Sequence, residues 1–223
     1  MYSSIAVGHI DTPNKTKRTQ PITTFSIHHM AGFMTGKACA EMFSKKSTQA
    51  SANYCIGQDG VAWASAGEEY RAWTSSTGDC ATGDQCAITI ELANCSGAPE
   101  WKVGDDTIEK CIQIMVDVCQ RYGIKEVKWS KDKNVRKKDP TVMYMHKDWA
   151  ATVCPGPYLE KKIPEYIIPE VNKRIGKTTS HFEIVNDEKL YHVQIGAFKN
   201  KDNANKLAEE LNEKGYRTYI AQY

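Results

Sequence analysis

Two histidines and a cysteine give this chain its clearest set of soft or borderline metal ligands. His28 stands at the end of a strand-like segment, and Cys154 follows His146 by eight residues. A catalytic zinc ion takes three protein ligands as a rule and leaves a position for water. Any one of these residues alone is more often an ordinary core or surface residue, and their spacing is not a recognised zinc pattern. Their setting adds weight, because Pro155-Gly156-Pro157 fixes the backbone beside the thiol.

Glu91 is an unusual residue for its position, since it places a carboxylate inside the apolar segment 88–92. A buried carboxylate is costly unless it is paired or functional. It could act as general base for water activated by a metal ion. Lys147-Asp148, next to His146, offers polar groups that could orient the imidazole ring. These residues together make metal-assisted hydrolysis a candidate chemistry.

The elements that must position these residues are short strands and three helices. Strands are predicted from apolar and β-branched residues over 21–30, 52–56, 61–64 and 86–93, with a turn at Asp59-Gly60. Helices are predicted over 37–45, 106–122 and 160–174, the last interrupted or ended near Pro164 or Pro169. Asp106 with Glu109 resembles a capping box of the second helix, and Gly123 suits its end.

Length and composition limit the class of protein. The 223 residues allow one domain with a small appendage, or two small domains. With 41% hydrophobic and 25% charged residues, the chain is not expected to be disordered. It has no apolar run of about 18 residues, and residues 1–10 do not resemble a secretory signal peptide. The eight cysteines are therefore expected as reduced thiols, and the absence of a CxxC pair argues against a zinc ribbon or a thioredoxin-like site.

Positive charge is concentrated between residues 125 and 138. Seven basic residues against Glu126 and Asp132 give this segment a net charge of +5, while the whole chain carries +2. A solvated loop is the first interpretation. Contact with nucleic acid and attraction to an anionic polymer such as the bacterial wall are the alternatives.

Residues 20–160 contain five motifs in a fixed order. They are Ile27-His28-His29-Met30-Ala31-Gly32, Ser51-Ala52-Asn53-Tyr54-Cys55-Ile56 with Asp59-Gly60, Arg71-Ala72-Trp73, Ile88-Thr89-Ile90-Glu91-Leu92-Ala93-Asn94, and His146-Lys147-Asp148 with Cys154-Pro155-Gly156-Pro157. Together they resemble the motifs of the zinc-dependent N-acetylmuramoyl-L-alanine amidases. This amidase-2 family includes phage endolysins and peptidoglycan recognition proteins. The resemblance implies an α/β fold with a central mixed sheet flanked by helices.

The resemblance also implies roles for individual residues. It makes His28, His146 and Cys154 the Zn²⁺ ligands, Glu91 the general base and Thr152 a donor to the developing oxyanion. It places three further residues in the substrate groove, namely Asn53, Arg71 and Trp73. The chain departs from the family pattern at three positions: Asn53 replaces a common His, Thr74 replaces the His or other polar residue that often follows the third motif, and Ala52 stands where some relatives have a catalytic Tyr.

The remaining residues suggest a second part of the chain. Residues 176–188 have the composition of a linker, and residues 189–223 have a strand–helix–strand pattern, which leaves 1–175 for the catalytic domain. The segment Tyr191-His192-Val193-Gln194-Ile195-Gly196-Ala197-Phe198 resembles the sporulation-related (SPOR) peptidoglycan-binding repeat. The match covers half of the usual module. Two tails could therefore pair in a homodimer, or the tail could dock on its own amidase domain or stay loosely ordered.

The resemblance makes the chain a peptidoglycan hydrolase that cleaves the amide between N-acetylmuramic acid and L-alanine. An endolysin would be made in the bacterial cytoplasm without a signal peptide and would act on the wall after release. The alternatives are a cytoplasmic muropeptide-recycling amidase and a non-catalytic peptidoglycan-binding protein. The expected partner is bacterial peptidoglycan, and neither nucleic acid nor a membrane is expected.

Overall fold

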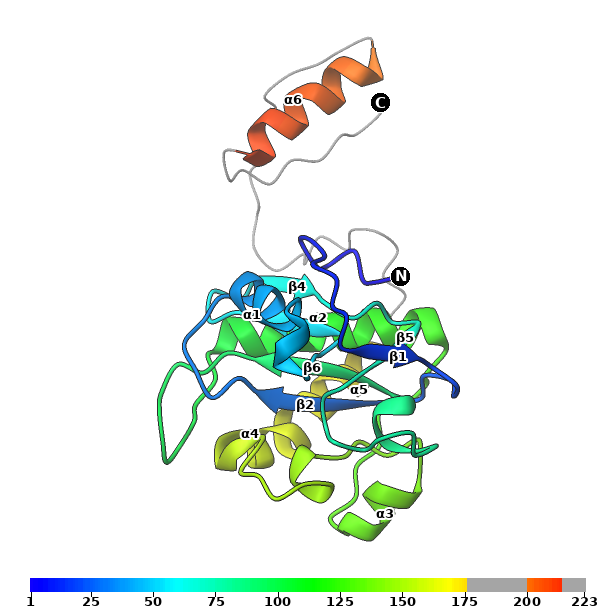
Figure 1. Ribbon diagram of the computed structural model, residues 1–223. Coiled ribbons are helices and arrows are strands. Elements are labelled where there is room, and N and C mark those ends of the chain that lie inside the picture. Colours follow the sequence, from blue (N-terminus) through cyan, green and yellow to red (C-terminus); the bar gives the residue numbers. More distant parts are fainter. Residues whose placement is uncertain (176–199, 214–223) are drawn as a thin grey trace. The chain divides into compact units, whose positions relative to one another are not determined.

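The computed structural model describes residues 1–175 and 200–213 of the chain (Figure 1). The chain divides into two units, Met1–Thr178 and Thr179–Tyr223. The predicted linker and the two predicted strands of the tail lie outside the described residues.

A four-stranded mixed sheet forms the centre of the first unit, with strand order β2-β6-β3-β4 (Figure 1). The strands are β2 (Thr24–His29), β6 (Ala87–Leu92), β3 (Tyr54–Ile56) and β4 (Ala62–Ala64). β2 and β3 both pair with β6 in parallel, and β4 returns antiparallel to β3. The predicted strands and the predicted fold class of a mixed sheet flanked by helices are confirmed.

The two faces of the sheet differ in chemistry because successive side chains of a strand point to opposite sides. On one face Ile27 and Ile90 pack in a cluster with apolar residues of α2 (Asp105–Tyr122) and α5 (Ile168–Ile175). The opposite face carries His28, which is in register with Glu91. The register therefore places an imidazole beside a carboxylate on the face that α2 does not cover.

The start of α2 differs from the prediction. Gly104 is the N-cap residue and makes no side-chain capping bond, so the expected capping box of Asp106 and Glu109 is wrong. Glu109 instead accepts hydrogen bonds from Arg174 of α5 at 2.7 and 3.1 Å. The end agrees with the prediction: Gly123 has φ +71°, a left-handed conformation that glycine adopts without a Cβ penalty.

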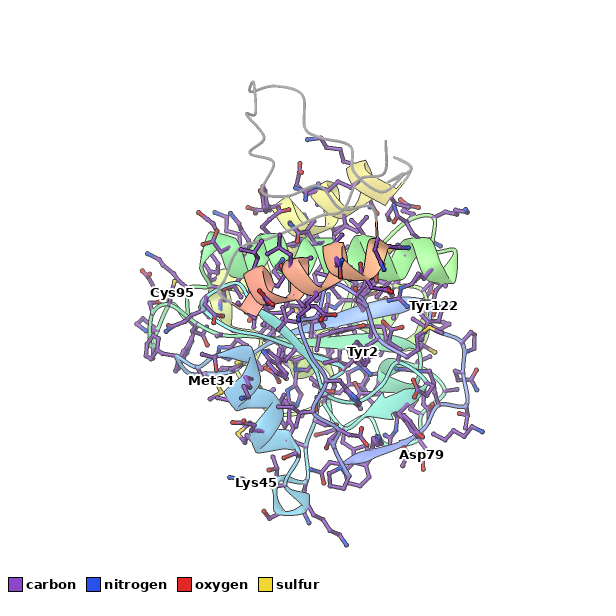
Figure 2. The ribbon with its side chains drawn as sticks, turned by 90° about the horizontal axis from the view of Figure 1, so that it is seen from above. Tyr2, Met34, Lys45, Asp79, Cys95 and Tyr122 are labelled. Atoms are coloured by element: carbon purple, nitrogen blue, oxygen red, sulfur yellow. The ribbon has the colours of Figure 1, made fainter. Side chains whose placement is uncertain are left out.

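The helix α1 (Gly36–Phe43) lies between Met34 and Lys45, which Figure 2 labels at its two ends. Its buried residues Cys39 and Phe43 pack with Cys55 in a second, smaller apolar cluster. A short 3-10 turn, η1 (Lys46–Thr48), follows α1. This cluster fills the part of the sheet face beside Cys55, which is itself in register with Glu91.

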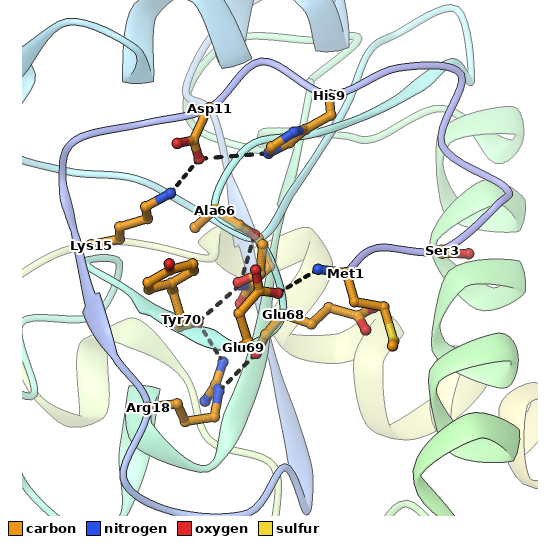
Figure 3. Close-up of polar contacts among 12 residues, drawn as sticks. Met1, Ser3, His9, Asp11, Lys15, Arg18, Ala66, Glu68, Glu69 and Tyr70 are labelled. Atoms are coloured by element: carbon orange, nitrogen blue, oxygen red, sulfur yellow. Dashed lines mark hydrogen bonds and ion pairs between the residues drawn. The ribbon is translucent and has the colours of Figure 1, made fainter.

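The sequence did not predict a second, two-stranded sheet. It pairs β1 (Lys15–Lys17), near the N-terminus, with β5 (Tyr70–Ala72) in antiparallel orientation. Arg18, just after β1, donates to the backbone carbonyl of Tyr70 at 3.0 Å (Figure 3). It also donates to the backbone carbonyl of Asp84 at 2.8 Å. Asp84 belongs to the 3-10 turn η2 (Gly83–Gln85). Arg18 therefore fixes the loop that leads into β6.

Residues 133–138 form a short helix, α3 (Lys133–Lys138), where the first interpretation was a loop. The side chain of Asp132 caps it by accepting from the backbone N–H of Asn134 at 2.8 Å. A 3-10 turn, η3 (His146–Asp148), and α4 (Gly156–Lys162) follow.

The predicted last helix of the unit is interrupted near Pro164, as expected, but it does not end there. A π-helical segment, η4 (Ile163–Ile167), continues α4 into α5. In this wider turn the backbone N–H of Ile168 donates to the carbonyl of Ile163. In a π turn a backbone N–H donates to the carbonyl five residues earlier instead of four. This change in hydrogen bonding accommodates the missing N–H of Pro164.

The described part of the tail is α6 (Lys201–Glu213), which agrees with the predicted helix. All eight cysteines lie in the described residues and all are free thiols. None of the helices within the described ranges combines the length and apolar character needed to cross a bilayer.

Candidate metal and hydrolytic site

The structure brings His28, His146 and Cys154 together. One ligand atom from each lies within 4.8 Å of the other two. Nδ1 of His28 is 3.4 Å from Sγ of Cys154, and the two imidazole ring centroids are 5.1 Å apart. Residues separated by more than a hundred positions in the chain thus meet at one point.

Strand register explains how the two histidines meet. Ser26 of β2 forms an isolated parallel bridge with Tyr144, and its Oγ donates to the Tyr144 carbonyl at 3.3 Å. Two residues further along each segment stand His28 and His146. Since side chains repeat every two residues on an extended strand, this register places both imidazoles on the same side.

The loop of Cys154 is shaped by backbone contacts. The backbone N–H of Lys147 donates to the Cys154 carbonyl at 3.2 Å, which ties this loop to η3. Gly156 has φ +83°, and a Cβ there would stand 3.2 Å from Cβ of Trp101. Thr152 is half-buried, and its Oγ1 accepts from the Cys154 N–H at 3.2 Å. Its hydroxyl proton is not used in that bond, so Thr152 can still donate.

Two serines contact the other nitrogen of His28. Nε2 lies 3.0 Å from Oγ of Ser26 and 3.2 Å from Oγ of Ser75. These contacts fix the ring so that Nδ1 faces Cys154. Hydrogen bonds to the second ring nitrogen are the usual way in which a metal-binding imidazole is oriented.

A buried carboxylate holds the Ser75 loop in place. Oδ2 of Asp84 accepts from the backbone N–H of Ser75 at 2.8 Å, and Oδ1 accepts from the hydroxyl of Tyr144 at 2.6 Å. Tyr144 lies two residues before His146. One carboxylate therefore links the loop that contacts His28 to the segment that carries His146.

A buried ion pair holds the His146 turn. Arg136 of α3 donates to both oxygens of Asp148, at 2.7 and 2.6 Å, and both side chains are almost fully buried. Asp148 also accepts from the backbone N–H of Met145 at 2.9 Å. The sequence suggested that Asp148 could orient the ring of His146 directly, and the structure shows it acting on the backbone of the turn.

Glu91 faces the same site from the neighbouring strand. Its Oε2 is buried and has no hydrogen-bond partner among the described residues. Burial raises the pKa of Glu91 to about 8. An unpaired carboxyl in such a place is a recognised sign of a functional group, because a structural role would have supplied donors.

The other ionisable groups of the cluster have perturbed pKa values as well. Burial lowers the pKa of His28 well below its usual range, and the nearby His146 and His29 lower it further. Burial also lowers the pKa of His146, against an opposing effect of Asp84. Both imidazoles are therefore neutral at pH 7, which is the form that binds metals. Burial and the neighbouring Glu91 raise the pKa of the Cys154 thiol.

The donor set fits Zn²⁺. Two imidazole nitrogens and one thiolate are ligands that zinc accepts, and three protein ligands with an open position characterise catalytic zinc sites. The rise in the Cys154 pKa disfavours a thiolate in the absence of a cation, and a bound divalent ion would offset that cost. The carboxyl of Glu91 beside the cluster completes the groups needed for hydrolysis.

The three residues expected in the substrate groove have different surroundings. Asn53 is fully buried, and its amide nitrogen lies within hydrogen-bond distance of the carbonyls of Ala66 and Gly67, at 3.1 and 3.4 Å. Arg71 is nearly buried and donates to Oγ1 of Thr16 at 2.8 Å. Both make contacts within the domain, and a place in the substrate groove stays a prediction for them.

Trp73 is partly exposed, and its Nε1 is buried without a partner among the described residues. It lies two residues before Ser75, which contacts His28. A place in the groove therefore stays a prediction for Trp73.

The fold and the site define a class of protein: a hydrolase domain built on a mixed sheet, with a His/His/Cys cluster and a buried carboxyl on one face. Residues 18–157, well over half of the chain, match the Amidase_2 family model, described as N-acetylmuramoyl-L-alanine amidase. The chain belongs to this family. The predicted family and the predicted amidase activity are confirmed.

Solved structures of endolysins and related catalytic domains share the fold. PlyL has 15% sequence identity and a TM-score of 0.56, with 76% of this chain and 97% of that chain covered. The catalytic domain of PlyG has 16% identity and a TM-score of 0.54, covering 74% and 90%. A mutant endolysin from Bacillus subtilis has 14% identity and a TM-score of 0.51, covering 79% and 100%.

The tail has a family of its own. Residues 187–223 match the SPOR domain model, which confirms the predicted resemblance and supports binding to peptidoglycan. No curated protein matches the chain.

Proposed function

We propose that the chain is a zinc-dependent amidase in which His28, His146 and Cys154 hold the metal ion. The observation that carries this proposal is the convergence of their three ligand atoms within 4.8 Å, beside the unpaired carboxyl of Glu91. A bound Zn²⁺ would act as a Lewis acid toward a carbonyl oxygen and make water a stronger nucleophile at neutral pH.

In this proposal Glu91 carries the proton. It takes the proton from water as the oxygen attacks the lactyl carbonyl of N-acetylmuramic acid, and it then gives the proton to the departing amine of L-alanine. A pKa of about 8 leaves about a tenth of the carboxyl ionised at pH 7 and able to accept a proton, and a nearby cation would raise that fraction, so both transfers are accessible. The hydroxyl of Thr152 donates to the carbonyl oxygen as that atom gains negative charge.

We further propose an endolysin role, in which the protein is made in the bacterial cytoplasm and reaches the wall after release. The combination of an amidase family match with a peptidoglycan-binding tail supports it. A muropeptide-recycling enzyme acts on soluble fragments and has no need of a wall-binding module.

The substitution Glu91→Ala tests the catalytic assignment. The variant should fold, bind one zinc ion per chain and fail to release free L-alanine amino ends from purified walls. Glu41→Ala, which removes an exposed carboxylate on α1, is the matched control and should be fully active. Wild-type lysis by Glu91→Ala would refute the assignment, and new reducing ends in place of amino ends would indicate a glycosidase.

We also propose that the tail, whose residues 187–223 match the SPOR domain model, pairs with the tail of a second chain. Light scattering on the full chain and on a chain ending at Arg174 distinguishes the alternatives. A dimeric full chain and a monomeric shortened chain support tail pairing, and two monomers refute it.

A further inference from the structure

Six lysines lie on α3 and in the segment before it, all of them exposed except the half-exposed Lys137. Here we call them the lysine surface: Lys125, Lys128, Lys131, Lys133, Lys137 and Lys138. Within the described part of the chain, none of these ammonium groups lies within 4.0 Å of a carboxylate. Elsewhere in the domain such pairs occur, as between Lys147 and Glu160 at 2.5 Å. The positive charge of this surface is thus largely uncompensated.

The one arginine of the segment is withdrawn from this surface. Arg136 points inward to Asp148 and stacks on Trp129, with its guanidinium carbon 5.0 Å from the ring centroid. The six lysines that remain, against Glu126 and Asp132, leave a net charge of +4 on the outside. Asp132 is partly engaged, since it caps α3.

The type of cation indicates the type of partner. Arginine binds a single carboxylate or phosphate with a fixed, two-pronged geometry, whereas lysine presents a flexible point charge. Several lysines spread over a loop and a short helix therefore suit a flexible polymer with repeated single charges better than one fixed anion. A linear phosphodiester polymer has this character.

A depression of about 570 Å³ lies beside these lysines, lined by Asp132, Asn134, Val135, Lys138, Asp139 and Pro140. Asp139 uses Oδ1 to accept from the N–H and hydroxyl of Thr141, at 2.9 and 2.7 Å. Its other oxygen has no partner among the described residues. Carboxylate and amide oxygens in a depression can accept hydrogen bonds from hydroxyl groups, which a sugar or polyol repeat supplies.

The lysine surface is joined rigidly to the catalytic turn. Arg136 connects α3 to Asp148, and Lys137 lies over the ring of Trp149 with its Nζ 4.8 Å from the centroid. Asp148 closes the turn that begins at His146. A polymer bound to α3 would therefore be held on the same side of the domain as the ligand turn.

We propose that the lysine surface binds an anionic sugar- or polyol-phosphate polymer of the bacterial wall and so holds the amidase domain on its substrate. This inference goes beyond the proposed chemistry at the metal cluster. The proposed binding concerns attachment to the wall, so it can fail while the amidase assignment stands. Binding and hydrolysis are therefore measured separately.

The test compares two triple variants by sedimentation with purified walls. Lys131, Lys133 and Lys138 are changed to Gln in the test variant. Exposed lysines on another part of the domain, Lys17, Lys45 and Lys46, are changed to Gln in the control. Both sets are made in the Glu91→Gln background to prevent digestion, and each protein is mixed with intact walls and with walls stripped of phosphodiester polymers by hydrofluoric acid.

We expect the test variant to bind intact walls about a hundredfold more weakly at low salt, or about fivefold per lysine, whereas the control binds normally. Stripped walls should bind both variants equally. The salt dependence should be shallower for the test variant, since fewer counterions are displaced. With Glu91 restored, the test variant should hydrolyse a soluble muropeptide at the wild-type rate.

Three results would overturn the proposal. Equal binding of both variants to intact walls would mean a solvated surface without a partner. A defect of the test variant that persists on stripped walls would assign the lysines to carboxylates of the stem peptides. A nucleic-acid site would be indicated if the protein bound duplex DNA as tightly as a soluble polyol-phosphate polymer and the test variant lost affinity for both to the same extent.

Discussion

The buried carboxyl of Glu91 should make the stability of the metal-free protein fall as pH rises. Burial raises its pKa in the folded protein to about 8, against an ordinary value of 4.5. The folded state therefore holds this proton more tightly than the unfolded state. The resulting stabilisation is complete below pH 4.5 and is lost as pH rises through 8.

The size of the effect follows from the two pKa values. Each tenfold difference in proton affinity corresponds to about 1.4 kcal/mol, so linkage between pH 5 and pH 8 should lower the free energy of unfolding by about 3 kcal/mol through this group alone. Gln has the same shape as the protonated carboxyl and does not titrate. Glu91→Gln should therefore remove this part of the pH dependence.

The assay is urea denaturation of the wild type and of Glu91→Gln at pH 5, 6, 7 and 8, with a chelator present. Both proteins keep His28 and His146, so the histidine contributions cancel in the difference. Between pH 5 and pH 8 the free energy of unfolding of the wild type should fall by about 3 kcal/mol more than that of the variant. With Zn²⁺ present the difference should shrink, because a nearby cation favours the carboxylate. If the free energies of unfolding of the two metal-free proteins changed with pH in parallel, the argument that the folded protein keeps Glu91 protonated would be refuted.

Three further outcomes are expected. Arg136→Met leaves Asp148 as an unpaired buried charge and should lower the free energy of unfolding by about 3–5 kcal/mol, measured by urea denaturation, whereas the double change with Asp148→Leu should recover much of the loss. Ser75→Ala removes a contact to Nε2 of His28 and should weaken zinc binding about 10–100-fold in a chelator competition. An unchanged affinity for zinc would show that this contact does not orient the imidazole ring. Thr152→Val should lower kcat about 10²–10³-fold with unchanged zinc content, and a loss of zinc instead would assign Thr152 to the metal loop alone.

The sequence predicted the elements whose signals are local. Apolar and β-branched residues located β6, the carboxylate inside this apolar segment singled out Glu91, and Gly123 marked the end of α2. The failures were also local: Asp106 and Glu109 matched a capping pattern, but the N-cap residue is Gly104, two residues earlier. The helix α3 has no apolar periodicity, because its only buried side chain is Arg136.

The contacts that position the site could not be found from spacing. Ser26 had a usable signal, since it lies two residues before His28 on the same strand face. Ser75 and Asp84 had none, because the loop of Ser75 and the 3-10 turn of Asp84 meet the site only in the folded chain. Family resemblance located Asn53 but not its surroundings, which proved to be backbone carbonyls in the interior.

The central claim is that the chain hydrolyses the amide between N-acetylmuramic acid and L-alanine at the His28/His146/Cys154 cluster. Digestion of purified walls by the zinc-loaded protein in ¹⁸O-labelled water, followed by mass spectrometry of the fragments, tests it most directly. The account predicts one ¹⁸O atom in the lactyl carboxyl of muramic acid and an unlabelled free amine on L-alanine, with neither product formed by Cys154→Ser. Label in a stem-peptide carboxyl or at a sugar reducing end, or unchanged products from Cys154→Ser, would contradict it.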